Sequence, residues 1–462
     1  MTNLALIQPS HQYINLPSSK YMAPYNLLRL ATFVKEKIPS LDIAILNEEH
    51  GPLDCKINAD YIMISANSFT YENAVKLAKD AKSNGAVVGV GGIHATNLPI
   101  EVLKNRKSID YVFLGNGEQA LCELLEGKNP ERIANLAFRK NGEIILNPKT
   151  HLDINSIPIA NRSFVDMEAY FSYCKESNHV NYARAALTFT HSSCKWKIKS
   201  FDKKTNHNGC IYCSTNKNPL SIMTPERTLE EIKYLVNEFG VDYIENGSDS
   251  FTSTKKWLSS FADLMQKKGI RLPAMQIYAR ADEINKETAR LLAEINVVEV
   301  FIGFETGTDS GLKKLNKGLT TADGMRAAEL LTNNNIRIEA AIIEMFPGET
   351  KEESQKSFEY AKFLCNNFHI SKICAYTLTP TPGLHVFREL IEREPQYKGE
   401  DIFELEQLKK DYAKHFCSEP FEFYSEMATK IRLLKPAVDA SGMRTNSAPI
   451  KTIPGERRHT VP

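Results

Sequence analysis

Short apolar runs alternate with longer segments of helical spacing in the first part of the chain. The runs are rich in Ile, Val and Leu and end in polar residues or glycine; they are NLALIQ, DIAILN, DYIMISA, AVVGVGG and DYVFLGN. Such runs are typical of buried parallel strands, and the segments between them have the apolar spacing of amphipathic helices. The alternation predicts a doubly wound, Rossmann-like α/β domain over residues 1–128.

Residues 129–183 have a different pattern. The run FRKNGEIILNP predicts a small hairpin that turns at Asn141-Gly142, and INSIPIANRSF predicts an irregular linker. Over residues 184–390 the alternation resumes, with the strand candidates AALTFT, VDYIENGSD, AMQIYARAD, VEVFIGFETG, RIEAAIIEMFPGE and ICAYTLTP. Six strand-helix units predict a partial (β/α)6, TIM-like barrel. Residues 391–462 predict a small, mainly helical region that ends in a flexible tail.

Polar residues follow four successive strands of the predicted barrel, where barrels of this type place their chemistry. The first strand leads to Cys194, Cys210 and Cys213, the second to Asn246 and Asp249, the third to Arg280 and Asp282, and the fourth to Glu305. Each polar residue alone also fits a structural role, such as a helix cap or a surface ion pair. Together with three cysteines, they predict one site.

Composition and charge narrow the class of protein. Lys and Arg number 57 and Asp and Glu 56, so the net charge of +1 does not favour a nucleic-acid or membrane-surface partner. The N-terminus lacks the pattern of a signal peptide, and no apolar run reaches the length of about 18 residues that spans a bilayer. We therefore expect a cytoplasmic protein.

The cysteines suggest a metal site rather than disulfides, since nine in 462 residues are too sparse for a disulfide framework. Two residues lie between Cys210 and Cys213, and fifteen lie between Cys194 and Cys210. Three thiolates favour zinc, with His191 or His207 as the fourth ligand, or an iron-sulfur cluster with one iron left open. The other six cysteines are scattered along the chain, and we interpret them as small apolar residues. They are Cys55, Cys122, Cys174, Cys365, Cys374 and Cys417.

These motifs resemble the radical SAM enzymes, and within them the cobalamin-dependent class, over about residues 1–390. The family signature C-x3-C-x-aromatic-C is matched in its second half by Cys210, Tyr212 and Cys213. Further similar runs are VGGIHATNLPIEVL, DYVFLGNGEQAL, YIENGSDSFT, YARADEI, FIGFETGTDSGLKKLNKGLT, FPGET and LTPTPGL. The resemblance implies a cobalamin-binding domain followed by a radical SAM barrel.

The chain departs from the family at the first cysteine of the signature, where Asn206 stands. Cys194 is expected to replace it, through the lysine-rich insertion KWKIKSFDKKTNHNG. Closing a loop of fifteen rather than three residues costs only about 1.5 kcal/mol more, which metal ligation exceeds. The resemblance then implies that these three cysteines hold a 4Fe-4S cluster whose open iron chelates S-adenosylmethionine.

The resemblance also implies roles for other residues. Electron transfer through the cluster cleaves S-adenosylmethionine to a 5'-deoxyadenosyl radical. Tyr212 is expected to pack against the adenine, Arg280 to face the methionine carboxylate or ribose, and Glu305 to hydrogen-bond polar groups of S-adenosylmethionine. Asn246 belongs to the same cofactor-binding set, and Asp249 is expected to serve that cofactor or the substrate.

The cobalamin half lacks the motif D-x-H-x-x-G, by which a histidine ligates the cobalt in other cobalamin proteins. His94 lies in a different context, GGIHAT, and is as well explained as a core or supporting histidine. Cobalamin is therefore expected to be held by backbone and small residues. The strand-end residues expected to bind it are Ser65, Asn67, Gly91, Gly92, Gly117 and Glu118.

Two enzymatic outcomes and one non-catalytic outcome remain open. By family analogy, methylcobalamin delivers a methyl group to an unactivated carbon or to phosphorus of a small-molecule substrate; the alternative is a radical rearrangement or cyclisation without methyl transfer. The expected electron donor is a flavodoxin or ferredoxin. The non-catalytic alternative is a zinc-stapled protein that binds an anionic partner through the lysines of the insertion, Lys195, Lys197, Lys199, Lys203 and Lys204.

Overall fold

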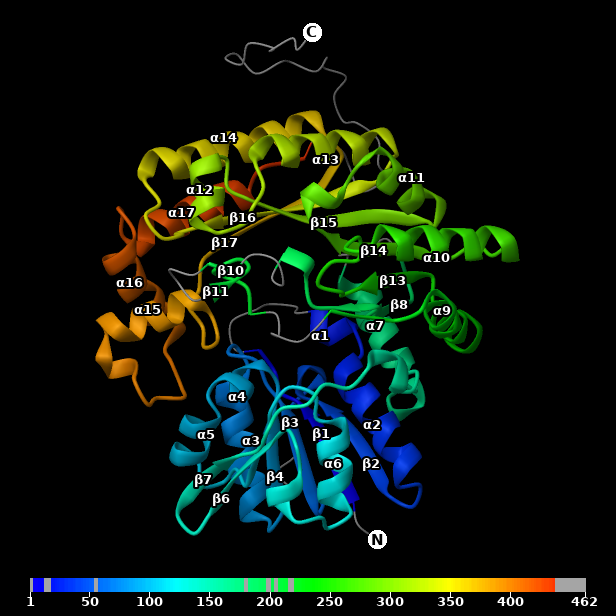
Figure 1. The fold of residues 1–462 in the computed structure, drawn as a ribbon, viewed down its shortest axis with the longest axis vertical. Coiled ribbons are helices and arrows are strands. Elements are labelled where there is room, and N and C mark those ends of the chain that lie inside the picture. Colours follow the sequence, from blue (N-terminus) through cyan, green and yellow to red (C-terminus); the bar gives the residue numbers. More distant parts are fainter. Residues whose placement is uncertain are drawn as a thin grey trace.

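The computed structural model describes residues 3–11, 18–53, 57–177, 182–196, 201–202, 207–214 and 220–436. Within them the chain forms two α/β units, at the bottom and the top of Figure 1, with further helices along one flank. No helix in these ranges is both long and apolar enough to cross a membrane. The residues of the sequence predictions that lie outside the described ranges are Cys55, Lys197, Lys199, Lys203, Lys204, Asn206 and the tail from residue 437.

The first unit is built on a seven-stranded sheet of order β2-β1-β3-β4-β5-β6-β7. Its strands are β1 (Asn3–Gln8), β2 (Asp42–Asn47), β3 (Tyr61–Ser65), β4 (Val87–Gly91), β5 (Tyr111–Phe113), β6 (Leu136–Lys140) and β7 (Glu143–Leu146). Its helices are α1 (Ser18–Tyr21), α2 (Tyr25–Lys37), α3 (Tyr71–Ser83), α4 (Ile93–Asn97), α5 (Pro99–Asn105) and α6 (Glu118–Leu125). Strands β1 to β5 are parallel, as the alternating pattern predicts. The chain order reverses between β1 and β3, where doubly wound sheets bind their ligands.

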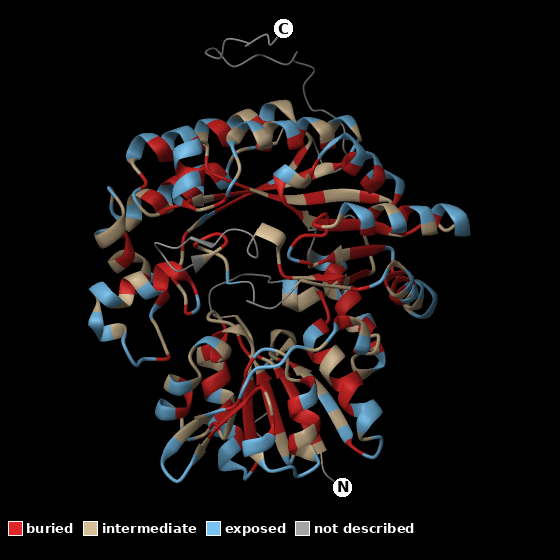
Figure 2. Cartoon of the chain, viewed as in Figure 1, coloured by how far each residue is buried: buried red, intermediate tan, exposed pale blue. Residues whose placement is uncertain are grey.

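Both faces of this sheet are buried at its central strands β1, β3 and β4, which explains their continuous apolar runs. Along β1, Leu4 and Leu6 point into one apolar core, while Ala5 and Ile7 point into the core on the other face. Helices cover the two faces, and Figure 2 shows the central strands of the first sheet as buried and its edge strands as more exposed.

The predicted hairpin forms, but it belongs to the first sheet. Asn141 and Gly142 have φ of 49° and 85°, the positive values that a tight hairpin turn requires. Strand β6 pairs antiparallel with β5, and β7 pairs with β6. The sheet therefore extends to Leu146, beyond the boundary expected at residue 128, and the irregular linker begins only after it.

The second unit has a six-stranded parallel sheet of order β17-β16-β15-β14-β13-β8, which confirms the six predicted strand-helix units. Its strands are β8 (Ala185–Thr188), β13 (Tyr243–Asn246), β14 (Ala274–Ala279), β15 (Val297–Glu305), β16 (Arg337–Glu344) and β17 (Ile370–Thr377). Its helices are α9 (Pro225–Phe239), α10 (Lys255–Lys268), α11 (Lys286–Glu294), α12 (Asp309–Lys314), α13 (Thr321–Asn333) and α14 (Lys351–Asn367). Helix α7 (Met167–Ser177) precedes this sheet in the chain.

Two short ribbons lie between β8 and α9. They pair β9 (His191–Ser192) with β12 (Ser221–Ile222), and β10 (Phe201–Asp202) with β11 (His207–Asn208). Cys194 follows β9, and Cys210 and Cys213 follow β11. The loop after the first barrel strand therefore carries all three cysteines, as predicted.

The C-terminal helices α15 (His385–Arg393), α16 (Leu405–Phe416) and α17 (Phe421–Arg432) connect the two units. Helix α17 packs against β17 and α14 of the barrel. Ile211, inside the cysteine loop, is buried in the same apolar cluster as residues of α15, α16 and α17. These helices thus cover one side of the cysteine loop.

Asp401, in the segment before α16, docks on the first unit and is fully buried. Its carboxylate accepts hydrogen bonds from both Nε (2.8 Å) and Nη2 (2.7 Å) of Arg106. It also accepts hydrogen bonds from the hydroxyl of Tyr71 at 2.7 Å and from the side-chain amide of Asn105 at 3.2 Å. We call Asp401 and these three partners the Asp401 clasp.

Candidate cofactor sites

A pocket of about 520 Å³ lies at the carboxyl ends of the strands in the first sheet. The residues of the predicted cobalamin set that line it are Ser65, Gly91, Gly92, Gly117 and Glu118. Other parts of its wall come from the linker, through His151 and Asp153, and from the β9–β12 ribbon, through Ser192 and Ser221. The pocket therefore lies between the first sheet and the segments that lead into the barrel.

Asn67, the sixth residue of that set, is not among the lining residues of the pocket. Its Oδ1 accepts hydrogen bonds from the backbone N–H groups of Phe69 (2.8 Å) and Thr70 (3.2 Å). The side chain thus caps the turn that leads into α3. An asparagine that follows a strand can either cap a turn or bind a ligand. The sequence pattern alone does not distinguish these two roles.

His94 is a core residue of the first unit. Its Nδ1 lies 3.0 Å from the Ser68 hydroxyl, and its Nε2 lies 2.9 Å from the backbone carbonyl oxygen of Asp401. The ring stacks on Tyr71, and burial lowers the pKa of His94 to about 4. Both ring nitrogens are engaged within the protein, so His94 is not placed to ligate cobalt; His151 is the histidine that lines the pocket.

Gly92 makes the tight turn between β4 and the pocket, with a φ of 92°. A Cβ at this position would overlap the backbone carbonyl oxygen of Ala66, which lies at the end of the adjacent strand. Larger residues are therefore excluded both by backbone conformation and by the neighbouring strand.

Gly92→Ala is expected to lower the free energy of unfolding by about 3 kcal/mol, because it adds a backbone collision to an unfavourable φ. Gly85→Ala is the matched control: Gly85 has a φ of 86°, but no atom lies within 4 Å of the position that a Cβ would take there. It is expected to cost only about 1 kcal/mol. Chemical denaturation of both variants measures the difference, and equal losses would contradict the steric explanation.

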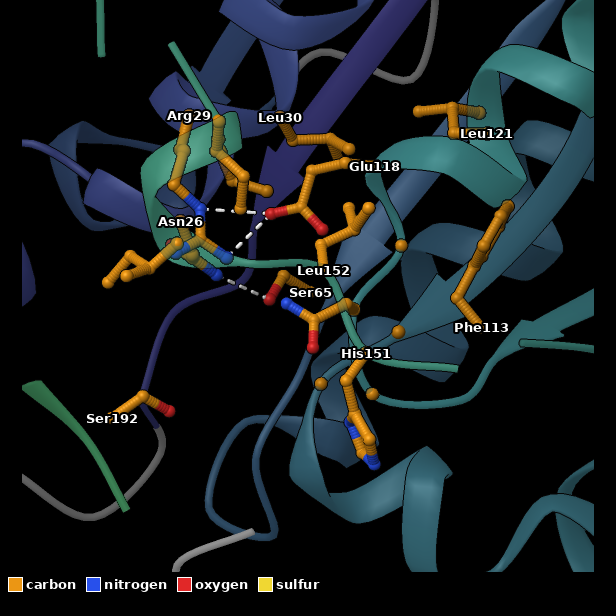
Figure 3. Close-up of a pocket in the computed structure, with 18 of the residues that line it drawn as sticks. Asn26, Arg29, Leu30, Ser65, Phe113, Glu118, Leu121, His151, Leu152 and Ser192 are labelled. Carbon is orange, nitrogen blue, oxygen red and sulfur yellow. Dashed lines mark hydrogen bonds and ion pairs between the residues drawn. The ribbon is translucent and has the colours of Figure 1, made fainter. Parts of the chain in front are cut away.

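Arg29 and Glu118 form an ion pair on the pocket wall, from α2 and the first turn of α6 (Figure 3). Nε and Nη2 of Arg29 both donate to the same carboxylate oxygen, Oε1, at 2.9 and 2.5 Å. Beside this pair, the amide of Asn26 donates to the Ser65 hydroxyl at 2.8 Å. Sequence reasoning missed Arg29 and Asn26, which lie on a helix and carry no motif.

The β9–β12 ribbon connects the pocket to the cysteine loop. Ser192 and Ser221 are paired across it, and both line the pocket. The linker is fixed to the same ribbon by Asn155, whose side-chain amide donates to the carbonyl oxygen of Ile222 at 3.0 Å. Cys194 lies two residues after Ser192, so one ribbon supports both candidate sites.

The backbone turns sharply just before Cys194, where Ser193 has a φ of 74°. Asp249 stabilises this turn, because its Oδ2 accepts a hydrogen bond from the Ser193 N–H at 2.6 Å. At the other end of the insertion, the N–H of Cys213 donates to the carbonyl oxygen of Cys210 at 3.1 Å. The predicted residue Asp249 therefore contacts the cysteine loop directly.

Asn316, in the turn after α12, holds the two ends of the insertion together. Its carbonyl oxygen accepts a hydrogen bond from Nε1 of Trp196 at 2.8 Å, two residues after Cys194. Its side-chain amide donates to the carbonyl oxygen of Gly209 at 2.6 Å, next to Cys210. One residue thus bridges the segments on both sides of the long gap.

Arg280 and Lys317 are cations beside the cysteines. Burial alone lowers the pKa of the Arg280 guanidinium, and ion pairing with Asp282 at 3.0 Å opposes this. The charges of Cys210 and Cys194 also raise this pKa, so that on balance it lies above its ordinary value. Nη2 of Arg280 also donates to the carbonyl oxygen of Lys317 at 2.9 Å.

Tyr212, Glu305 and Lys317 form a hydrogen-bonded network near Cys210, in which Glu305 and Lys317 are buried and Tyr212 is partly buried. The Tyr212 hydroxyl donates to Oε1 of Glu305 at 2.8 Å, and Nζ of Lys317 donates to the same oxygen at 2.5 Å. Glu305 has a φ of 65°, an uncommon conformation for a residue other than glycine. Sequence reasoning selected Tyr212 and Glu305 but missed Lys317, although it lies in the family-like run LKKLNKGLT.

Asn246, also predicted as a cofactor residue, is 1% exposed and hydrogen-bonded at the strand ends. Its amide donates to the hydroxyls of Thr188 (3.2 Å) and Thr190 (3.3 Å), and its Oδ1 accepts from the Ser248 N–H at 3.2 Å. The Ser248 hydroxyl in turn accepts from the His191 N–H at 2.8 Å. Asn246 therefore stabilises the start of β9 through its hydrogen bonds to Thr190 and Ser248.

The described residues contain no group of three His, Cys, Asp or Glu side chains close enough to share a single metal ion. His191 is enclosed by Phe251 and Trp257, and burial lowers its pKa to about 3. The side chain of His207 lies outside the described residues. The described part of the chain thus offers no compact set of ligands for a single zinc ion. A 4Fe-4S cluster differs in that it binds one thiolate per iron.

Comparison with known proteins gives the same two-part organisation. The radical SAM superfamily model matches residues 206–361, and the B12 binding domain model matches residues 41–125. An uncharacterized methyltransferase, PH0819 from Pyrococcus horikoshii, is 24% identical over 407 residues, which cover 85% of this chain and 83% of the relative.

Two solved structures share the fold. The radical S-adenosylmethionine methyltransferase TsrM from Kitasatospora setae, solved with cobalamin and a 4Fe-4S cluster bound, has a TM-score of 0.66 at 16% identity and covers 85% of this chain and 76% of its own. The cobalamin-dependent S-adenosylmethionine radical enzyme OxsB has a TM-score of 0.64 at 13% identity, and the alignment covers 88% of this chain but only 58% of OxsB. With a B12-binding domain followed by a radical SAM domain, the chain belongs to the cobalamin-dependent radical SAM enzymes.

Proposed function

We propose that this enzyme transfers a methyl group to an unactivated carbon, or to phosphorus, of a small-molecule substrate. The observation that carries the proposal is the β9–β12 ribbon. Ser192 and Ser221 line the pocket of the B12-binding domain, and Cys194 follows Ser192 by two residues. Two cofactor sites on one ribbon suit a reaction that needs both cofactors next to one substrate.

Cys194, Cys210 and Cys213 are proposed to hold the 4Fe-4S cluster. The donor set fits, because the three soft thiols come from one loop whose ends are bridged by Asn316. Arg280 beside Cys194 and Cys210 offsets part of the negative charge of a thiolate-bound cluster. The bound cluster supplies the electron that cleaves S-adenosylmethionine to a 5'-deoxyadenosyl radical.

S-adenosylmethionine is proposed to bind among Tyr212, Arg280 and Glu305. The ring of Tyr212 is fixed by its hydrogen bond to Glu305, so it offers a rigid surface for the adenine. Arg280 and the neighbouring Lys317 are the cations for the methionine carboxylate or ribose. Asp249 is assigned a positioning role, because its Oδ2 orders the turn before Cys194.

Cobalamin is proposed to occupy the pocket of the B12-binding domain, where it supplies the transferable methyl group. Gly91, Gly92 and Gly117 line this pocket, so part of its wall is backbone without side chains. Methyl transfer is preferred over rearrangement or cyclisation because PH0819 and TsrM are both described as methyltransferases. An acidic electron donor, a flavodoxin or ferredoxin, suits the lysine-rich insertion, which carries Asp202 as its only acidic residue.

The products formed from S-adenosylmethionine test the proposed reaction. Cobalamin-dependent methyl transfer consumes one molecule as the methyl donor and a second as the radical source. Anaerobic turnover with cobalamin and a strong reductant should therefore yield both S-adenosylhomocysteine and 5'-deoxyadenosine. Formation of 5'-deoxyadenosine without S-adenosylhomocysteine would contradict methyl transfer.

Asn316→Asp is expected to make the cluster labile, because it replaces the amide that donates to Gly209 by a carboxylate that repels the same carbonyl oxygen. Iron release into a chelator should become about five to ten times faster, which corresponds to the loss of one hydrogen bond. Asn335→Asp is the control. Asn316 and Asn335 both follow a helix with a positive φ, 51° and 56°, but Asn335 is exposed and far from the cysteine loop in the sequence. Equal release rates in the two variants would exclude this role of Asn316.

A further inference from the structure

One carboxylate oxygen of Glu118 has no hydrogen-bond partner in the part of the chain that the structure describes. The side chain is 4% exposed, and its Oε1 accepts both hydrogen bonds from Arg29. Its Oε2 is fully buried and has no hydrogen-bond partner among the described residues. Glu118 lines the pocket proposed for cobalamin, and Figure 3 shows its carboxylate beside Arg29 and above Ser65.

A buried carboxylate oxygen without a donor is unfavourable, because it has lost its bonds to water. The charge of Glu118 is partly balanced by Arg29, but that pairing uses only Oε1. The second oxygen is fixed in position by the same ion pair. It is therefore a preorganised acceptor for an N–H or O–H group of a molecule that enters the pocket.

The periphery of the corrin ring carries primary amide side chains, whose N–H groups are donors of this kind. We propose that Oε2 of Glu118 accepts a hydrogen bond from one of these amides and so selects amidated corrinoids over those with a carboxylic acid at the same position. A carboxylate there would face the carboxylate of Glu118, and like charges in a buried site repel strongly. This inference rests on the proposed location of cobalamin.

The test is an absorbance titration of the apoprotein with cobalamin and with each of its monocarboxylic acid derivatives, in which one amide is hydrolysed. The wild-type protein should bind one of the acids at least about tenfold more weakly than cobalamin, the effect of one hydrogen bond to a charged group. In Glu118→Gln, the side-chain oxygen stays with Arg29 and the NH2 group faces the pocket. This variant should bind cobalamin more weakly and should bind that same acid more tightly than the wild type does.

Glu123→Gln is the matched control, because it makes the same charge change on the same helix, where Glu123 pairs with Lys128 at the surface. It should retain the wild-type preference. Equal affinity of the wild type for cobalamin and for all the acids overturns the inference. This comparison uses the wild-type protein alone, so it does not depend on whether a variant folds. Absence of cobalamin binding by the wild type would instead overturn the proposed location of cobalamin. Failure of the inference and failure of the proposed pocket therefore give different results.

Discussion

Cys194→Ala is expected to remove the iron-sulfur cluster as completely as Cys210→Ala, although fifteen residues separate the two cysteines. Asn316 bridges Trp196 and Gly209, so the segments on both sides of the fifteen-residue gap are held together. The charges of both thiols also raise the pKa of Arg280. Iron and acid-labile sulfide in anaerobically prepared protein should fall from about four per chain to near zero in both variants.

Cys365→Ala is the control for these variants. Cys365 is buried in α14 and takes no part in the proposed site, so its replacement should leave the iron content unchanged. The assignment of Cys194 fails if Cys194→Ala keeps a full cluster and still cleaves S-adenosylmethionine while Cys210→Ala does neither.

Asp401→Ala is expected to lower the free energy of unfolding by about 3 kcal/mol. The change leaves the guanidinium of Arg106 and the hydroxyl of Tyr71 without their buried acceptor. The segment before α16 should then detach from the B12-binding domain, with faster hydrogen exchange in α4 and α5. Chemical denaturation and hydrogen exchange measure the two effects.

Glu400→Ala removes the neighbouring carboxylate, which is exposed, and should change stability by less than about 0.5 kcal/mol. If both variants behave alike, the Asp401 clasp does not join the C-terminal helices to the first unit. Because His94 contacts the backbone of Asp401 and stacks on Tyr71, a detached clasp should also expose His94.

Local patterns predict the elements of this fold well, because their causes lie within a few residues. Helix α9 begins after Thr224, which accepts a hydrogen bond from the Arg227 N–H, and ends at Gly240 with a φ of 59°. The hairpin at Asn141-Gly142 is equally visible in the sequence. Its membership of the first sheet is not, because that depends on pairing with β5, which is distant in the chain.

The residues of the candidate site likewise include some that local patterns predict and others that they do not. Strand-end position predicts the cysteines, Arg280 and Glu305, since parallel strands bring their carboxyl ends to one edge. Tyr212 is predicted by the family signature instead. Asn316 and Lys317 contact the cysteine loop from more than 100 residues away, and no local pattern marks such contacts. Asn67 has the expected polar side chain at a strand end, but its amide caps its own turn.

The most direct measurement is the iron and corrinoid content of the same anaerobically purified protein after reconstitution with iron, sulfide and cobalamin. Two cofactor sites on one chain predict about four irons and about one tightly bound corrinoid per chain. Zinc in place of iron, or a full cluster in protein that binds no corrinoid, would contradict this account.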